Sequence, residues 1–315
     1  MPQNIYYIAF QNKLLTAEGT QFQRYFGELM RMCYPGFRDT RARAFRGDSG
    51  NDGWIESEGA YYQVYGPEIN SQNVEEYAIK KITTDFEKLN KGWDDIVKIR
   101  KFFFVFNNRM QSISAELQKI MAKIKKDHNL EETGIVDTRQ LLGLFNSRSE
   151  DEKILLVGDL TSVPERIEDS FSPLSILLNK LANQDRDILH FLNVTHPDFA
   201  EKIRINDLSD EIKGKMEYFS HFASEIDNIL KNSRGDAQDI VPTLKNLYKK
   251  SKEKFPESTL GAPDARYIWM IEELIPPEAH DSSHYTAYRT AAEIIFARYF
   301  ESCDLYESPG SNSTS

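Results

Sequence analysis

The chain has 315 residues and a formal net charge of −10, and this length allows two domains that each bury a core. The negative charge excludes a protein that coats nucleic acid non-specifically, because Lys and Arg supply most of that affinity. The sequence has no apolar run of the roughly 20 residues that a transmembrane helix needs, and residues 1–10 lack the basic start of a signal peptide. We therefore expect a cytoplasmic protein without a membrane span.

The first two elements are predicted to be a strand at residues 5–10 and a helix from Thr20. The helix is indicated by apolar residues that recur at helical spacing: Phe22, Phe26, Leu29 and Cys33. Glu28 projects from the edge of this apolar stripe. A single glutamate on a helix is most often a solvated surface residue.

Residues 51–56 and 60–65 are predicted to form a β-hairpin. Gly59 closes the turn between them, because glycine tolerates the positive φ that a tight hairpin turn requires. With the turn centred on Gly59 and the residue before it, Asp52 lies opposite Tyr65. Trp54 then lies opposite Gln63.

Directly opposed residues of a hairpin share a face. This register therefore predicts that an acid, an amide and a phenol point the same way: Asp52, Gln63 and Tyr65. The alternative is a structural hairpin whose aromatic residues only pack a core, since tyrosines are common in strands.

Arginines directly precede the hairpin, at positions 38, 41, 43 and 46. On an extended segment Arg41 and Arg43 face the same way. Arg41, Arg43 and Arg46 are therefore our candidate contacts to DNA phosphates beside the hairpin. The alternative is a solvated charged edge of the sheet.

Helices and strands alternate after the hairpin. We expect a helix over residues 71–89, a covered strand at 101–106, a helix from Ser114, a strand at 134–137 and a helix that Asp137 caps. This order predicts an α/β domain in which helices flank a small mixed sheet.

The stretch Gly47-Asp48-Ser49-Gly50-Asn51-Asp52-Gly53, followed by Tyr62-Gln63-Val64-Tyr65, resembles the Mrr-like branch of the PD-(D/E)XK (restriction-endonuclease-like) nucleases. The resemblance implies a restriction-endonuclease-like domain over residues 1–147 that cleaves double-stranded DNA with Mg²⁺ as cofactor. It also implies a set of metal ligands: Glu28, Asp52, Gln63 and the carbonyl of Val64. Oxygen ligands of this kind suit Mg²⁺.

The sequence departs from the family at one position: where the family carries a lysine, this chain has Tyr65. A phenol has a pKa of about 10, so at neutral pH it donates a hydrogen bond but brings no positive charge. In some nuclease-like families the lysine has moved to the following helix, and Lys80 and Lys81 are therefore candidate replacements. Surface lysines on a helix more often only keep it soluble.

The sequence character changes at residue 148. Residues 148–307 are predicted to form an all-α domain, and residues 308–315 have the composition of a disordered tail. The expected helices are separated by Gly and Pro residues: 174–192, 209–231, 244–254, 264–274 and 285–303. The apolar stripes after Ser209 lead us to expect a partner, or a second copy of the chain, against this region.

The segment from Ala291 to Glu307, AAEIIFARYFESCDLYE, resembles the end of the C-terminal domains of ABC three-component conflict systems, which include Lamassu-type antiviral defence. The resemblance implies two partners: an SMC-like ABC ATPase and a small middle component.

Three functions remain open from the sequence. The first is an effector subunit acting as a Mg²⁺-dependent DNA endonuclease. The second is a catalytically inactive nuclease-like scaffold that senses DNA or assembles the same system, which the tyrosine at position 65 and the net negative charge favour. The third is an interaction adaptor that binds no DNA at any salt concentration.

Overall fold

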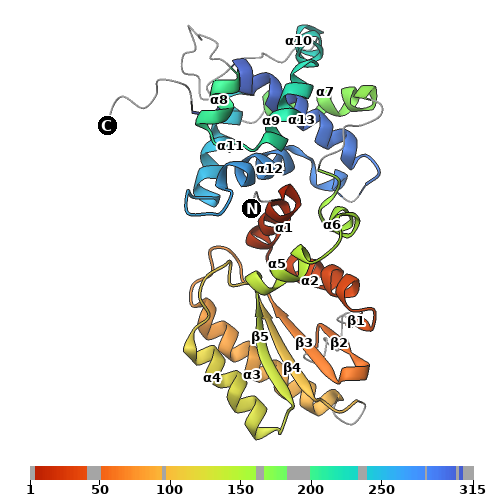
Figure 1. The fold of residues 1–315 in the computed structure, drawn as a ribbon, viewed down its shortest axis with the longest axis vertical. Coiled ribbons are helices and arrows are strands. Elements are labelled where there is room, and N and C mark those ends of the chain that lie inside the picture. Colours follow the sequence, from red (N-terminus) through yellow and green to blue (C-terminus); the bar gives the residue numbers. More distant parts are fainter. Residues whose placement is uncertain are drawn as a thin grey trace, which may run out of the picture. The chain divides into compact units, whose positions relative to one another are not determined.

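The computed structural model describes residues 4–40, 51–93, 97–160, 167–182, 199–232, 240–280, 282–302 and 305–307. The chain forms two compact units. One is Ala9–Asp159, and the other combines Met1–Ile8 with Leu160–Ser315. Figure 1 shows a small mixed sheet with helices in the first unit and helices in the second, which confirms the predicted fold class. Among the described residues no helix is both long and apolar enough to cross a membrane.

The sheet has five strands in the order β1-β2-β3-β4-β5. Pairs β1/β2 and β2/β3 are antiparallel, and pairs β3/β4 and β4/β5 are parallel. The interior position of β4 agrees with the prediction from its apolar sequence KFFFVF. The strands are β1 Phe37–Asp39, β2 Gly53–Ile55, β3 Ala60–Tyr65, β4 Lys101–Phe106 and β5 Glu132–Asp137.

The helices before Leu160 are α1 Ile5–Thr16, α2 Gly19–Cys33, α3 Val74–Trp93, α4 Ala115–Asp127, α5 Thr138–Asn146 and α6 Glu150–Val157. The predicted strand at residues 5–10 is wrong, because this segment begins α1. A short apolar run does not distinguish a strand from a buried helix. The predicted start of α3 at Ser71 is three residues early. The capping box at Asp137 is confirmed.

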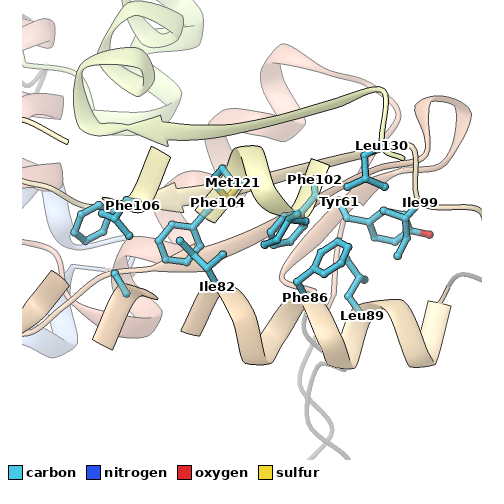
Figure 2. Packing of buried hydrophobic residues seen from close by; sticks show 13 residues of the cluster. Tyr61, Ile82, Phe86, Leu89, Ile99, Phe102, Phe104, Phe106, Met121 and Leu130 are labelled. Carbon is cyan, nitrogen blue, oxygen red and sulfur yellow. The ribbon is translucent and has the colours of Figure 1, made fainter. Parts of the chain in front are cut away.

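Helices α3 and α4 pack on one face of the sheet through a core of aromatic and aliphatic side chains (Figure 2). Phe86 of α3 meets Phe102 of β4 edge to face, with ring centroids 5.0 Å apart. The opposite face packs against α2, where the rings of Phe26 and Tyr62 are 5.7 Å apart. The hairpin β2-β3 is therefore held between helices on both faces.

The buried side chain of Asn107 joins three elements of the N-terminal unit at the end of β4. Its Nδ2 donates to the carbonyls of Leu14 and Ala17, at 2.8 and 2.9 Å, and thereby binds free carbonyls at the end of α1. Its Oδ1 accepts a hydrogen bond from the hydroxyl of Thr138, the first residue of α5, at 3.1 Å.

The described helices of the second unit after Leu160 are α7 Phe171–Ala182, α8 Phe199–Ile205, α9 Asp210–Ser220, α10 Ala223–Asn232, α11 Ile240–Lys254, α12 Ala262–Leu274 and α13 Tyr285–Ser302. The single helix predicted over residues 209–231 is two helices, α9 and α10, and α8 was not predicted. Ser209 caps α9 by accepting a hydrogen bond from the backbone N–H of Ile212.

A group of charged side chains lies between α9, α12 and α13, and its members Lys215, Arg289 and Glu293 are buried. Glu293 Oε1 is 2.8 Å from Lys215 Nζ and 3.6 Å from Arg289 Nε. Arg289 also forms an ion pair with Glu272, which accepts a hydrogen bond from the Tyr285 hydroxyl at 2.7 Å. Each of the two carboxylates therefore faces a cation inside the helical unit.

Candidate functional site

The predicted hairpin is present, and its register differs from the prediction. Glu56–Glu58 form a 3₁₀ turn, and Gly59 follows in the left-handed conformation with φ of 55°. Gly53 consequently pairs with Tyr62 and Trp54 with Tyr61, so the predicted pairs of Asp52 with Tyr65 and Trp54 with Gln63 are wrong.

The register differs by two residues because the turn is centred one residue earlier than predicted. A shift of two residues preserves the alternation of side chains within β2 and β3. The observed register, continued by one residue, sets Asp52 opposite Gln63. The main-chain bond from Asp52 N–H to the Tyr62 carbonyl, 2.9 Å, agrees with this arrangement.

The carboxylate of Asp52 is buried at the end of β2, with the residue only 6% exposed. Its Oδ2 accepts a hydrogen bond from the backbone N–H of Val64 at 2.7 Å. Its Oδ1 accepts one from Nε2 of Gln23, on α2, at 2.6 Å. Asp52 is thus tied to both β3 and α2.

Gln63 is buried at 1% exposure, and its Oε1 has no hydrogen-bond partner among the described residues. Strand alternation places Gln63 on the same face as Tyr61 and Tyr65, both of which pack in the α3/α4 core. An unsatisfied buried amide oxygen costs about 1–3 kcal/mol. Such an oxygen is suited to bind a cation.

The Val64 carbonyl points from β3 toward the side on which Asp52 lies. The N–H and C=O of one strand residue point to the same neighbouring strand, and the Val64 N–H points to Asp52. Asp52 and Val64 therefore offer a carboxylate and a carbonyl oxygen, the ligand type that Mg²⁺ prefers. Gln63 offers its amide oxygen on the α3/α4 side of the sheet. No group of three His, Cys, Asp or Glu side chains with metal-binding geometry occurs in the described parts of the chain.

Glu28 is half-buried on α2, five positions after Gln23. On α2, Gln23 is the side chain that the structure shows in contact with Asp52. Glu28 as a metal ligand stays a prediction.

Tyr65 packs in the core at the end of β3. Its ring stacks on Phe106 with centroids 5.8 Å apart and an interplanar angle of 7°. Burial raises the pKa of the Tyr65 hydroxyl above its ordinary value, an effect that the nearby Tyr77 reinforces and Arg109 opposes. The phenol is therefore neutral at physiological pH, as predicted.

The two candidate lysines differ in their surroundings. Lys81 Nζ lies 2.7 Å from Asp85 Oδ2, and Lys88 binds the other oxygen of the same buried carboxylate at 3.0 Å. Lys80 is exposed on α3. The candidate DNA contacts Arg41, Arg43 and Arg46 lie outside the described residues.

Two residues of the site were not predicted: Gln23 and Asn51. Asn51 is buried, accepts a hydrogen bond from Gly53 N–H at 3.0 Å, and donates one to the Thr40 hydroxyl at 3.1 Å. The sequence contains only a weak indication that Gln23 belongs to the site. It is a polar residue next to the apolar stripe of Phe22 and Phe26, and so lies at the edge of the buried helix face. Its contact with Asp52 joins positions 29 apart in sequence.

The helical part of the chain matches the model of a domain family. Residues 172–307 match the family model of C-terminal domain 10 of the ABC-three component (ABC-3C) systems. The match covers the described helices from α7 onward, and confirms the predicted resemblance of this region to a C-terminal domain of such systems. It supports a role as one subunit of a multi-component system.

No curated protein and no solved structure gives a significant match to the chain. The resemblance of residues 47–65 to PD-(D/E)XK nucleases stays a prediction.

Proposed function

We propose that the protein is an effector subunit of an ABC-3C defence system and cleaves double-stranded DNA as a Mg²⁺-dependent endonuclease. The observation that carries the nuclease part is the placement of buried Asp52 opposite buried Gln63, whose Oε1 has no partner among the described residues. The family match of residues 172–307 supports the subunit part.

In this proposal Asp52, Gln63 and the Val64 carbonyl hold Mg²⁺, with Glu28 as a further ligand. When bound, Mg²⁺ lowers the pKa of a water ligand and neutralises charge on the phosphate. Asp52 supplies a negative charge whose position is fixed by hydrogen bonds from Val64 and Gln23.

The proposal assigns the basic side chains to the substrate. Lys80 or Lys81 supplies the cation that Tyr65 lacks, and stabilises negative charge on the phosphate. The segment that contains Arg41, Arg43 and Arg46 contacts the DNA backbone.

The deciding experiment is a plasmid-nicking assay with the protein purified together with the other components of its system. We expect cleavage that requires Mg²⁺ and that Asp52→Ala abolishes. Asp39→Ala is the matched control, because Asp39 lies on the adjacent strand β1 and forms an exposed ion pair with Arg31. Equal cleavage by Asp52→Ala and wild type would reject this site.

The helical unit is proposed to bind the partners: an SMC-like ABC ATPase and a small middle component. We expect the ATPase encoded nearby to co-purify with the full chain, or the chain to self-associate in sedimentation experiments. A strict monomer that retains neither component contradicts this assignment.

A nuclease-like scaffold is the second candidate, and the stacking of Tyr65 on Phe106 favours it. At the position where the nuclease family carries a lysine, this chain has an aromatic residue that packs a core. A scaffold binds DNA but does not cleave it, so wild-type protein that binds DNA with no Mg²⁺-dependent nicking would support this function.

A further inference from the structure

The hydrogen bond between Gln23 and Asp52 links α2 to the candidate metal site. Gln23 Nε2 is 2.6 Å from Asp52 Oδ1, a short distance that is typical of a bond to an ionised acceptor. The acceptor is almost fully buried. Gln23 is therefore placed to control how this carboxylate is oriented.

The two donors given for Asp52 come from different elements. Gln23 binds Oδ1 from helix α2, and the Val64 N–H binds Oδ2 from strand β3. One donor on each oxygen prevents the carboxylate from rotating. Each oxygen of a carboxylate can accept more than one interaction. Both of these donors are neutral groups.

Packing holds α2 against β3 on both sides of Gln23. The N–H of Gly19 donates to the carbonyl of Gly66 at 2.7 Å. A Cβ atom at Gly66 would lie 2.7 Å from the Phe22 Cβ, so helix and chain approach as closely as a glycine allows. Phe26 packs on Tyr62, one turn further along α2. Gln23 thus projects from a fixed part of the helix.

We propose that Gln23 is the positioning residue of the metal site: its amide holds the Asp52 carboxylate in the orientation that binds a divalent cation. This inference rests on the proposed function, because it takes Asp52 to be a metal ligand. Hydrogen-bond partners of metal-binding side chains typically contribute about 10–100-fold to metal affinity. We expect an effect of this size from Gln23.

The test measures Mn²⁺ binding by isothermal titration calorimetry on the full-length chain. Gln23→Met keeps the side-chain length and removes the donor, and we expect affinity to fall about 10–100-fold. Gln21→Met is the matched control, since Gln21 lies on the same helix but is exposed and hydrogen-bonds Tyr25. We expect it to bind Mn²⁺ like wild type. Thermal unfolding without metal establishes that each variant is folded.

A third variant separates positioning from simple packing. Gln23→Lys retains a donor next to Asp52 but adds a positive charge, so we expect the metal-free protein to stay folded while Mn²⁺ binding is lost. If Gln23 only fills space, the folded Gln23→Met variant binds Mn²⁺ as wild type does, and this result overturns the inference. Normal Mn²⁺ binding by folded Gln23→Lys would show that the cation does not bind beside Gln23, and this result also overturns the inference.

The outcomes also distinguish this inference from the proposed function. Wild-type protein that binds no Mn²⁺ overturns the metal site and the role of Gln23 together. Wild-type binding that Asp52→Ala removes and Gln23→Met leaves unchanged overturns the role of Gln23 alone.

Discussion

Asp52 in the N-terminal unit and Glu293 in the helical unit are both buried carboxylates, and their surroundings differ. Lys215 and Arg289 face Glu293 at 2.8 and 3.6 Å. Asp52 accepts hydrogen bonds from a backbone N–H and an amide. These partners of Glu293 are cations, whereas the two donors of Asp52 named here are neutral groups.

The two kinds of partner predict different consequences when they are removed. A charge-paired buried carboxylate costs stability when either partner is removed, because the other charge is left alone. A neutral hydrogen-bond donor orients a carboxylate but supplies no opposite charge. The predictions below test this distinction.

The largest expected effect is on stability, at the helical cluster. Lys215→Met leaves Glu293 without its nearest cation, and removing one partner of a buried pair typically costs about 3–5 kcal/mol. Urea unfolding measures this loss. The same variant should bind Mn²⁺ at the N-terminal unit as wild type does.

The control for this prediction is on the same helix. Lys213 forms an exposed ion pair with Glu217 at 3.9 Å, so Lys213→Met should change the free energy of unfolding by no more than about 1 kcal/mol. Equal stability of the two variants would show that the cluster is not a structural element.

A smaller effect is expected from the candidate catalytic lysines, and it appears in cleavage. Loss of one charged contact to the transition state costs about 10²–10³ in rate. We therefore expect one of Lys80→Ala and Lys81→Ala to cleave plasmid DNA slowly while remaining folded. Lys119→Ala, at an exposed lysine of α4, is the control.

Full activity in both lysine variants would contradict the proposal that a lysine of α3 replaces the lysine of the nuclease family. The structure makes the two variants unequal, because Lys81 is paired with Asp85 and Lys80 is exposed. Lys81→Ala should therefore lower stability slightly in addition to any effect on rate.

The smallest expected effect is that of Tyr65→Phe. The ring keeps its stacking on Phe106, and a hydroxyl hydrogen bond contributes only about 0.5–1.5 kcal/mol. We expect less than about a tenfold loss of cleavage. A loss as large as that of Asp52→Ala would give the hydroxyl a direct role in the reaction. For an inactive scaffold, Tyr65→Lys is the informative variant, since it could restore weak cleavage.

The sequence predicts the parts of the fold that local signals determine. The hairpin follows from Gly59, the start of α5 from its capping box, and the interior strand from a run of four phenylalanines and a valine. The first helix was missed because IYYIAF fits a strand as well as a helix. The hairpin register was missed because the 3₁₀ turn shifts the centre of the turn by one residue.

The candidate site was predicted only in part, for a physical reason. Asp52 and Gln63 could be assigned to one hairpin from the sequence, although not in the observed pairing, whereas Gln23 reaches Asp52 through the packing of α2 on β3. The pairing of Lys81 with Asp85 follows helical spacing and was visible in the sequence. Contacts between elements distant in sequence depend on packing, which periodicity does not describe.

The first helix, α1, belongs to both units of the chain. Ile5 and Ile8 are buried and group with the helical unit, whereas Leu14 and Ala17 are bound by Asn107 in the N-terminal unit. During synthesis, residues 5–8 leave the ribosome long before residue 160. They are therefore made well before the rest of the helical unit with which they group. A fragment that begins at Leu160 lacks two buried isoleucines, and one that ends at Asp159 carries them without the rest of their unit. Efforts to express the halves separately should move these first residues with the helical half.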